Sequence, residues 1–149
     1  MAISRKMTLL LPTFKGENDD LKHLYFILTD PCFDYEQNRP EMLLLVNCSS
    51  IKEGRVYDDA CVLTAGEHSF IVKDSFIFYQ EMRIESLFNI EKGLEEKRFI
   101  KKEITNDELY FKILEGVFKS KKTKRQYIRF IKGAIKQNAC LDILQNNQA

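Results

Sequence analysis

The residues of this chain that could act on a phosphate or move a proton lie between positions 23 and 68. Arg39 is followed by Pro40, and this proline holds the arginine extended and removes one backbone donor. A guanidinium held in this way could bind a phosphate through two parallel hydrogen bonds and stabilise charge during phosphoryl transfer. A surface ion pair with Glu36 or Glu41 explains the same arginine equally well.

A threonine and two histidines complete the set of candidates. Thr64 ends an apolar run just before a glycine turn, where its hydroxyl could donate to a phosphate oxygen or simply stabilise the turn. His68 follows that turn, so a partly exposed imidazole could act there as an acid or a base, and a solvated turn histidine is the alternative. His23 opens a predicted strand, which favours a structural role.

The four cysteines show no metal-ligand spacing. Cys32, Cys48, Cys61 and Cys140 contain no CxxC pair, and phosphate-loop, dinucleotide-binding, serine-hydrolase and zinc-protease motifs are missing from the sequence. We therefore expect no metal and no cofactor, and four reduced structural thiols. A catalytic cysteine beside one of the histidines is the alternative.

Positive charge is concentrated near the C-terminus. Residues 1–116 have a formal balance of −6, whereas residues 117–136 have a balance of +8 and no acid. Such a segment suits a polyanion, and its interleaved Tyr127 and Phe130 could stack on unpaired bases. A solvated helix face and a basic helix on an anionic membrane are the alternatives. The residues that we expect to bind RNA are Lys121, Lys122, Lys124, Arg125 and Arg129.

The elements that must position these residues are predicted to be strands first and helices second. Apolar runs bounded by turn residues predict strands over 23–29, 41–48, 60–64 and 69–72, then 75–79 with an extension over 81–84. A shorter strand is expected around 7–11, and 30–40 is predicted to be a charged loop. Strands at this spacing indicate a small barrel or sandwich.

Helical periodicity begins after residue 85. We expect an amphipathic segment over 86–96, a helix over 106–119 that starts at a Thr105–Glu108 capping box, and a helix over 123–136. The 149 residues fit one domain, with a β part over about 22–85 and a helical part over about 86–136 whose segment 119–136 is basic. No apolar run is long enough for a membrane span or a signal peptide, so we expect a cytoplasmic protein.

Several short motifs resemble the MazF/PemK (Kid) family of endoribonuclease toxins. They are Asp30-Pro31, Glu36-Gln37, Arg39-Pro40 before an apolar strand, and a strand that ends in Thr64. The resemblance covers residues 22–118. It implies an SH3-like barrel, usually a homodimer, which cleaves single-stranded RNA without a metal by using the 2′-hydroxyl as nucleophile. It also implies that Arg39 and Thr64 act on the scissile phosphate and that a dedicated antitoxin blocks the cleft.

The sequence therefore predicts a mainly β fold, an SH3-like barrel with two or three helices. The first functional hypothesis is a metal-independent endoribonuclease of a toxin–antitoxin system, with Arg39, Thr64 and His68 at the catalytic site and the basic segment holding RNA. The second is a non-catalytic barrel that binds nucleic acid or a protein partner, as a regulatory or phage-defence component.

Overall fold

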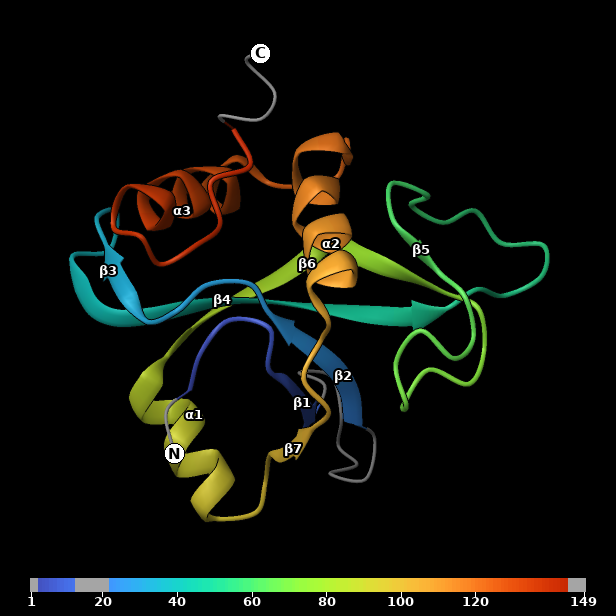
Figure 1. Cartoon of the computed structure of the whole chain (residues 1–149), viewed down its shortest axis with the longest axis horizontal. Helices are drawn as coiled ribbons and strands as arrows, with labels where there is room; N and C mark the ends of the chain where they lie inside the picture. Colours follow the sequence, from blue (N-terminus) through green and yellow to red (C-terminus); the bar gives the residue numbers. More distant parts are fainter. Residues whose placement is uncertain (1–2, 13–21, 145–149) are drawn as a thin grey trace.

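The computed structural model describes residues 3–12 and 22–144, which form a curled antiparallel sheet shaped like half a barrel, with helices on both faces (Figure 1). The described part of the chain is mainly β and contains seven strands and three helices. The strands are β1 (Thr8–Pro12), β2 (Lys22–Ile27), β3 (Cys32–Asp34), β4 (Arg39–Ser50), β5 (Val62–Leu63), β6 (Ser75–Ser86) and β7 (Ile100–Lys102). The helices are α1 (Leu87–Glu95), α2 (Asp107–Lys119) and α3 (Arg125–Lys136).

The two long strands organise the sheet. The strand order is β5-β6-β4-β2-β1-β7, with β3 pairing with β4 as well. All pairings are antiparallel, and the pairing of β4 with β6 changes register between Val46 and Cys48. Such a register shift bends a strand and re-aims the side chains beside it.

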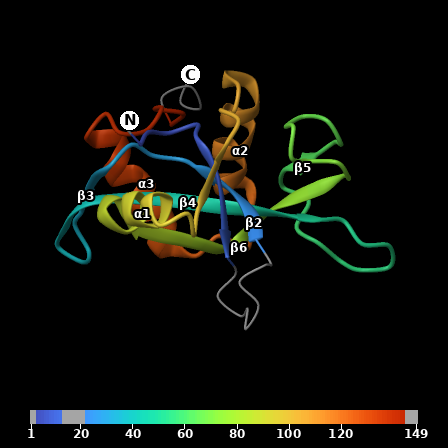
Figure 2. The same cartoon turned by 90° about the horizontal axis from the view of Figure 1, so that it is seen from below.

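The apolar run in β4 is continuous because both faces of the sheet are covered. Leu44 and Val46 belong to the larger core, which includes residues of α2 and α3. Leu43 and Leu45 belong to a smaller core under α1. The figures agree with this arrangement, since α2 and α3 lie on one side of β4 and α1 lies on the other (Figures 1 and 2). Strands buried on both faces lose the usual alternation of apolar and polar residues.

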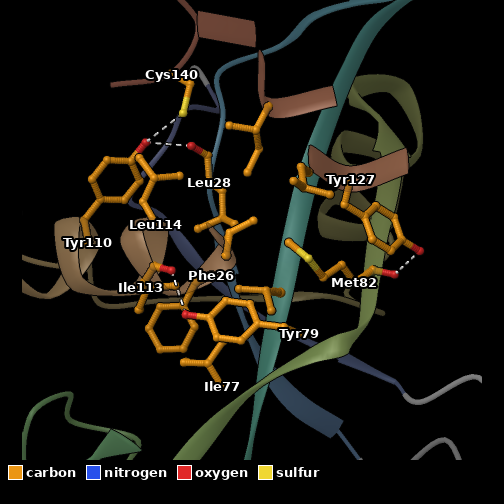
Figure 3. Packing of buried hydrophobic residues seen from close by; sticks show 14 of the residues in the cluster. Phe26, Leu28, Ile77, Tyr79, Met82, Tyr110, Ile113, Leu114, Tyr127 and Cys140 are labelled. Carbon is orange, nitrogen blue, oxygen red and sulfur yellow. Dashed lines mark hydrogen bonds between the residues drawn. The ribbon is translucent and has the colours of Figure 1, made fainter. Parts of the chain in front are cut away.

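Three tyrosines attach the helices to the sheet through buried hydroxyl groups (Figure 3). Tyr79 of β6 donates to the carbonyl of Ile113 in α2 at 2.7 Å. Tyr110 of α2 donates to the carbonyl of Leu28, the residue after β2, at 2.6 Å. Tyr127 of α3 donates to the carbonyl of Met82 in β6 at 2.9 Å. Because each buried hydroxyl has a partner, its hydrogen bond offsets the cost of removing it from water. Burial raises the pKa of Tyr79 and of Tyr110.

The prediction of a mainly β chain with C-terminal helices is confirmed, and all three helices form. The strand predicted over 69–72 is wrong, because a turn held by hydrogen bonds to His68 occupies that stretch. The capping box is also displaced by one residue, since the Asn106 side chain, not that of Thr105, accepts from the Leu109 N–H. The loop predicted over 30–40 contains the short strand β3. Across the described residues, no helix has the length and apolar character needed to cross a bilayer.

Candidate functional site

Arg39 lies at the start of β4, and Thr64 lies beside the far end of that strand. Arg39 is the first residue of that strand. Thr64 follows β5, which pairs with the first residues of β6. The same residues of β6 pair on their other side with Ser49 and Ser50, the last residues of β4. A strand advances about 3.3 Å per residue, so the two candidates are separated by roughly the length of β4, about 35 Å if it were straight. Figure 1 shows this separation as the distance between the β3 end and the β5 end of the sheet. Within one chain they cannot act on the same phosphate.

Arg39 is an exposed residue at the tip of the β3–β4 hairpin. Glu36, the expected partner, instead forms an ion pair with Arg129 of α3. Arg39 has no ion pair with any carboxylate that the structure describes. The ion pair with Glu36 or Glu41, which the sequence offered as the alternative, is therefore not formed among the described residues.

Thr64 is part of a closed turn. Its backbone N–H and its hydroxyl both donate to the carboxylate of Glu67, at 2.6 and 3.2 Å. Lys112 of α2 lies 3.7 Å from the other oxygen of that carboxylate. Thr64 is exposed, but its hydroxyl serves the turn, which is the alternative that the sequence offered.

His68 is buried rather than exposed at a rim, so the expected exposure is wrong. Only 2% of its surface is accessible. Its Nδ1 accepts from the Phe70 N–H at 3.0 Å, and its Nε2 lies 2.9 Å from the Glu103 carbonyl and 3.1 Å from the Thr8 hydroxyl. Because Nδ1 accepts, Nε2 carries the proton and donates to the carbonyl. Both ring nitrogens are therefore occupied: Nδ1 holds the turn within the 65–74 loop, and Nε2 joins that loop to β1 and to the residue after β7.

The four cysteines are free and buried, as predicted for structural thiols. Burial raises the pKa of Cys32 and Cys140 to about 11 and that of Cys48 to about 12. Cys48 lines the same groove as His23, which is the arrangement that a catalytic cysteine would need. Its raised pKa keeps it in the thiol form, which is a poor nucleophile.

A groove at the β5 end of the sheet gathers the side chains best suited to phosphate chemistry. It has a volume of about 550 Å³. We call it the hydroxyl–lysine groove; its polar side chains come from the start of β2, the end of β4 and the two loops beside them. They are Lys22, His23, Ser49, Ser50, Lys52, Ser69, Lys73 and Ser75. No acid is found among the described residues that line it. Nor do three or more His, Cys, Asp or Glu side chains cluster as metal ligands within residues 3–12 and 22–144.

Strand alternation explains why polar residues meet there. Side chains two positions apart share a face of a strand, so Asn47 and Ser49 lie on the face of Leu43 and Leu45. Helix α1 covers the leucines and lies toward the β3 end of the sheet (Figure 2). The face beyond the helix is open, and there β4 changes from apolar to polar residues. His23 occupies the equivalent place on β2.

Two further grooves continue from the first. The asparagine groove, of about 470 Å³, shares His23 and Ser49 with the hydroxyl–lysine groove. The aromatic groove, of about 540 Å³, shares Phe78 with the asparagine groove. Tyr57 and Phe76 lie 5.4 Å apart in it, and Phe76 and Phe78 lie 5.8 Å apart. We call the three together the groove track.

The basic segment contributes to the track with only some of its residues. Lys121 and Lys122 line the aromatic groove, and Lys124 lines the asparagine groove. Arg129 lies elsewhere on α3 and pairs with Glu36. Arg125 is exposed and lines none of the three grooves. The structure thus brings three of the five predicted RNA-binding residues to one surface.

Comparisons of the chain with models of protein families, with curated proteins and with solved structures yield no match.

Proposed function

We propose that this protein binds single-stranded RNA along the groove track and cleaves it in the hydroxyl–lysine groove without a metal. The observation that supports the proposal is the meeting of one imidazole, several hydroxyls and three ammonium groups in one open groove. Ammonium groups attract phosphates, and hydroxyl groups can donate to the phosphate oxygens. The aromatic rings along the rest of the track suit the stacking of unpaired bases.

The chemistry requires only an internal nucleophile. His23 accepts the proton of the 2′-hydroxyl, whose oxygen attacks the neighbouring phosphorus while the bond to the 5′-oxygen breaks. The products are a 2′,3′-cyclic phosphate and a 5′-hydroxyl, whose proton comes from a lysine ammonium or from water. Lys52 and Lys73 offset the charge that develops on the phosphate oxygens. RNA is required because DNA has no 2′-hydroxyl.

We extend the proposal to the MazF/PemK type of toxin, with the curled sheet as an SH3-like barrel, a homodimer as the active form and an antitoxin as the inhibitor. The curled half-barrel sheet with helices in the C-terminal part of the chain supports this extension. In this version, His23, Ser49 and Ser50 replace Arg39 and Thr64 at the scissile phosphate. An acidic antitoxin segment would compete with RNA for Lys22, Lys52 and Lys73.

The test compares the two sets of catalytic residues. Purified wild-type protein, His23→Ala and Arg39→Ala are incubated with a long single-stranded RNA in EDTA, and the new RNA ends are mapped. We expect His23→Ala to lower the cleavage rate by about 10²–10⁴-fold, as is typical when a general base is lost, and Arg39→Ala to cleave at nearly the wild-type rate. A fully active His23→Ala, or a wild type that produces no new ends, would contradict the proposed site.

A second candidate function is RNA binding without cleavage on the same track. The separation of Arg39 and Thr64 along β4 favours it, because the resemblance places these two residues together. Salt-sensitive binding of RNA with no new ends in the same assay would establish this function. Induction in cells then separates the two again, since only a ribonuclease toxin should arrest growth in a manner that depends on His23.

A further inference from the structure

The asparagine groove contains a buried side chain with an unused hydrogen-bonding atom. Asn47 is 6% exposed, and its Oδ1 has no hydrogen-bond partner. An unpaired buried acceptor is destabilising relative to a satisfied one, so an exception in a folded protein needs an explanation. Asn47 also lines a groove, so a small rotation of its side chain would bring the covered Oδ1 to a ligand that supplies the missing donor.

The sheet around Asn47 is built to leave that atom unpaired. On one side Asn47 is paired with Tyr25 of β2. On the other side the register of β6 shifts, so that Val46 pairs with Met82 and Cys48 with Ile77. Four residues of β6 lie between these pairs without a pairing partner on β4, and Oδ1 has no hydrogen-bond partner among the described residues. A register shift beside a groove is a common way to aim a side chain at a ligand.

The charges of the groove favour a base over a phosphate. Glu81 and Lys124 both line the groove, and the carboxylate of Glu81 would repel a phosphate. Arg83 lies over the Tyr25 ring at 5.2 Å and donates to Glu85 at 2.8 Å. The Tyr127 hydroxyl is already donated to a carbonyl. Phe78 adds aromatic surface on which a base can lie, whereas the Tyr25 ring is buried under Arg83.

We propose that the asparagine groove is a nucleobase-recognition subsite in which the Asn47 amide reads an RNA base that carries an amino group, with adenine preferred. An amide binds adenine through two hydrogen bonds, because its oxygen accepts from the amino group while its nitrogen donates to a ring nitrogen. His23 and Ser49 belong to both grooves, so the base read by Asn47 lies next to the phosphate in the hydroxyl–lysine groove. This inference rests on RNA being the ligand, and it sets the sequence preference of the proposed cleavage.

The test measures binding separately from cleavage. Octamers of 2′-O-methyl adenosine and 2′-O-methyl uridine have no free 2′-hydroxyl and cannot be cut by the proposed route. We expect the wild type to bind the adenosine octamer about tenfold more tightly by fluorescence anisotropy, since one good bidentate pair discriminates by about 1–3 kcal/mol. Asn47→Ala should reduce this preference to within about twofold and leave uridine binding nearly unchanged. Asn89→Ala, an exposed asparagine on α1, is the matched control.

A second variant distinguishes the loss of base recognition from misfolding. Asn47→Leu removes the unpaired acceptor and keeps the number and branching of the side-chain heavy atoms, so it should melt at or above the wild-type temperature and still lose the preference. Equal binding of both octamers by the wild type, or an unchanged preference in both Asn47 variants, would overturn the inference. Preference without any cleavage of natural RNA would retain the subsite and refute the nuclease, whereas cleavage without preference would do the reverse.

Discussion

At the scale of single residues, the environment of a side chain decides which of the candidate groups can do chemistry. His23 and His68 are the two histidines of the chain, and their sequence settings are similar because each lies at or just before the start of a predicted strand. The structure leaves His23 half-buried beside an open groove and uses both nitrogens of His68 for internal hydrogen bonds. Only the first is in a position to exchange a proton with a ligand.

His68 is therefore expected to matter for stability. His68→Ala removes the acceptor of the Phe70 N–H and the donor to the Glu103 carbonyl, and leaves a cavity beside Phe26. We expect it to lower the free energy of unfolding by about 3 kcal/mol, measured by urea denaturation. His68→Asn can still accept from Phe70 and should recover part of the loss. Unchanged stability in His68→Ala would show that these hydrogen bonds contribute little.

Cys48 makes the stability of the fold sensitive to alkaline pH. Burial raises its pKa from 9.0 to about 12. The native thiol therefore keeps its proton above pH 9, where the unfolded chain loses it. The resulting stability is complete below pH 9 and is lost as the pH rises from 9 toward 12, by about 1.4 kcal/mol per pH unit.

Urea unfolding of wild type and Cys48→Ala between pH 8 and pH 10.5, in the presence of a reductant, measures this contribution. The wild-type free energy of unfolding should fall more steeply above pH 9 than that of the variant. The other buried thiols and tyrosines affect both proteins equally, so the difference isolates Cys48. Parallel curves would show that the Cys48 pKa is not raised.

At the scale of elements, α2 is attached to β6 by a close approach that requires a glycine. A Cβ added to Gly116 would lie 2.0 Å from the Tyr79 hydroxyl oxygen and 2.7 Å from Cζ of that ring. Tyr79 cannot move aside, because it is fully buried and hydrogen-bonded to Ile113 (Figure 3). Glycine destabilises a helix relative to alanine, and at this position the close contact with Tyr79 offsets that cost.

We expect Gly116→Ala to destabilise the protein by about 2–3 kcal/mol, since overpacking outweighs the usual gain of up to about 1 kcal/mol for alanine in a helix. Tyr79→Phe removes the atom closest to the new methyl and should cost about 1 kcal/mol by itself. The double variant should be more stable than the sum of the two changes predicts, as measured in a double-mutant cycle. Additive effects would mean that the two elements are not in close contact.

Elements with a strong periodic pattern could be predicted from the sequence, and elements defined by a distant partner could not. The helices and the long strands β4 and β6 follow from 3.6-residue and apolar patterns. The three-residue β7 exists because it pairs with β1, more than 85 residues earlier in the chain. The apolar stretch 69–72 has strand-like composition, but the hydrogen bonds of His68 hold it as a turn.

The candidate site was largely hidden for the same reason. Asn47 and Ser49 follow an apolar run in β4, and the sequence shows this change of polarity. Their exposure to a groove depends on where α1 stops covering the sheet and where β6 shifts register. Neither the end of the surface that α1 covers nor the register shift of β6 can be predicted from the residues next to Asn47 and Ser49. Arg39 and Thr64 stand in motifs that resemble those of the toxin family, but the length of β4 separates them.

At the scale of the whole molecule, the basic segment works as part of a surface built from several elements. It supplies Lys119, Lys121, Lys122 and Lys124 to the groove track, whereas β2, β4 and the loops supply the other lysines. A body of net negative charge repels nucleic acid except where cations gather. Seven lysines line the track beside its aromatic rings, together with three acids, Asp58, Asp59 and Glu81.

The salt dependence of RNA binding tests this arrangement. Each phosphate contact with single-stranded RNA contributes about −0.7 to the slope of log K against log salt concentration. Lys121→Glu with Lys122→Glu should therefore reduce the magnitude of the slope by about 1.4 and weaken the binding of every RNA sequence. The matched control is Lys132→Glu with Lys136→Glu, two exposed lysines of α3 that line none of the three grooves. If both pairs change the slope equally, RNA responds to the net charge of the segment. A change confined to the first pair would place the phosphates along the aromatic groove, because charge elsewhere on the same segment would then have no effect.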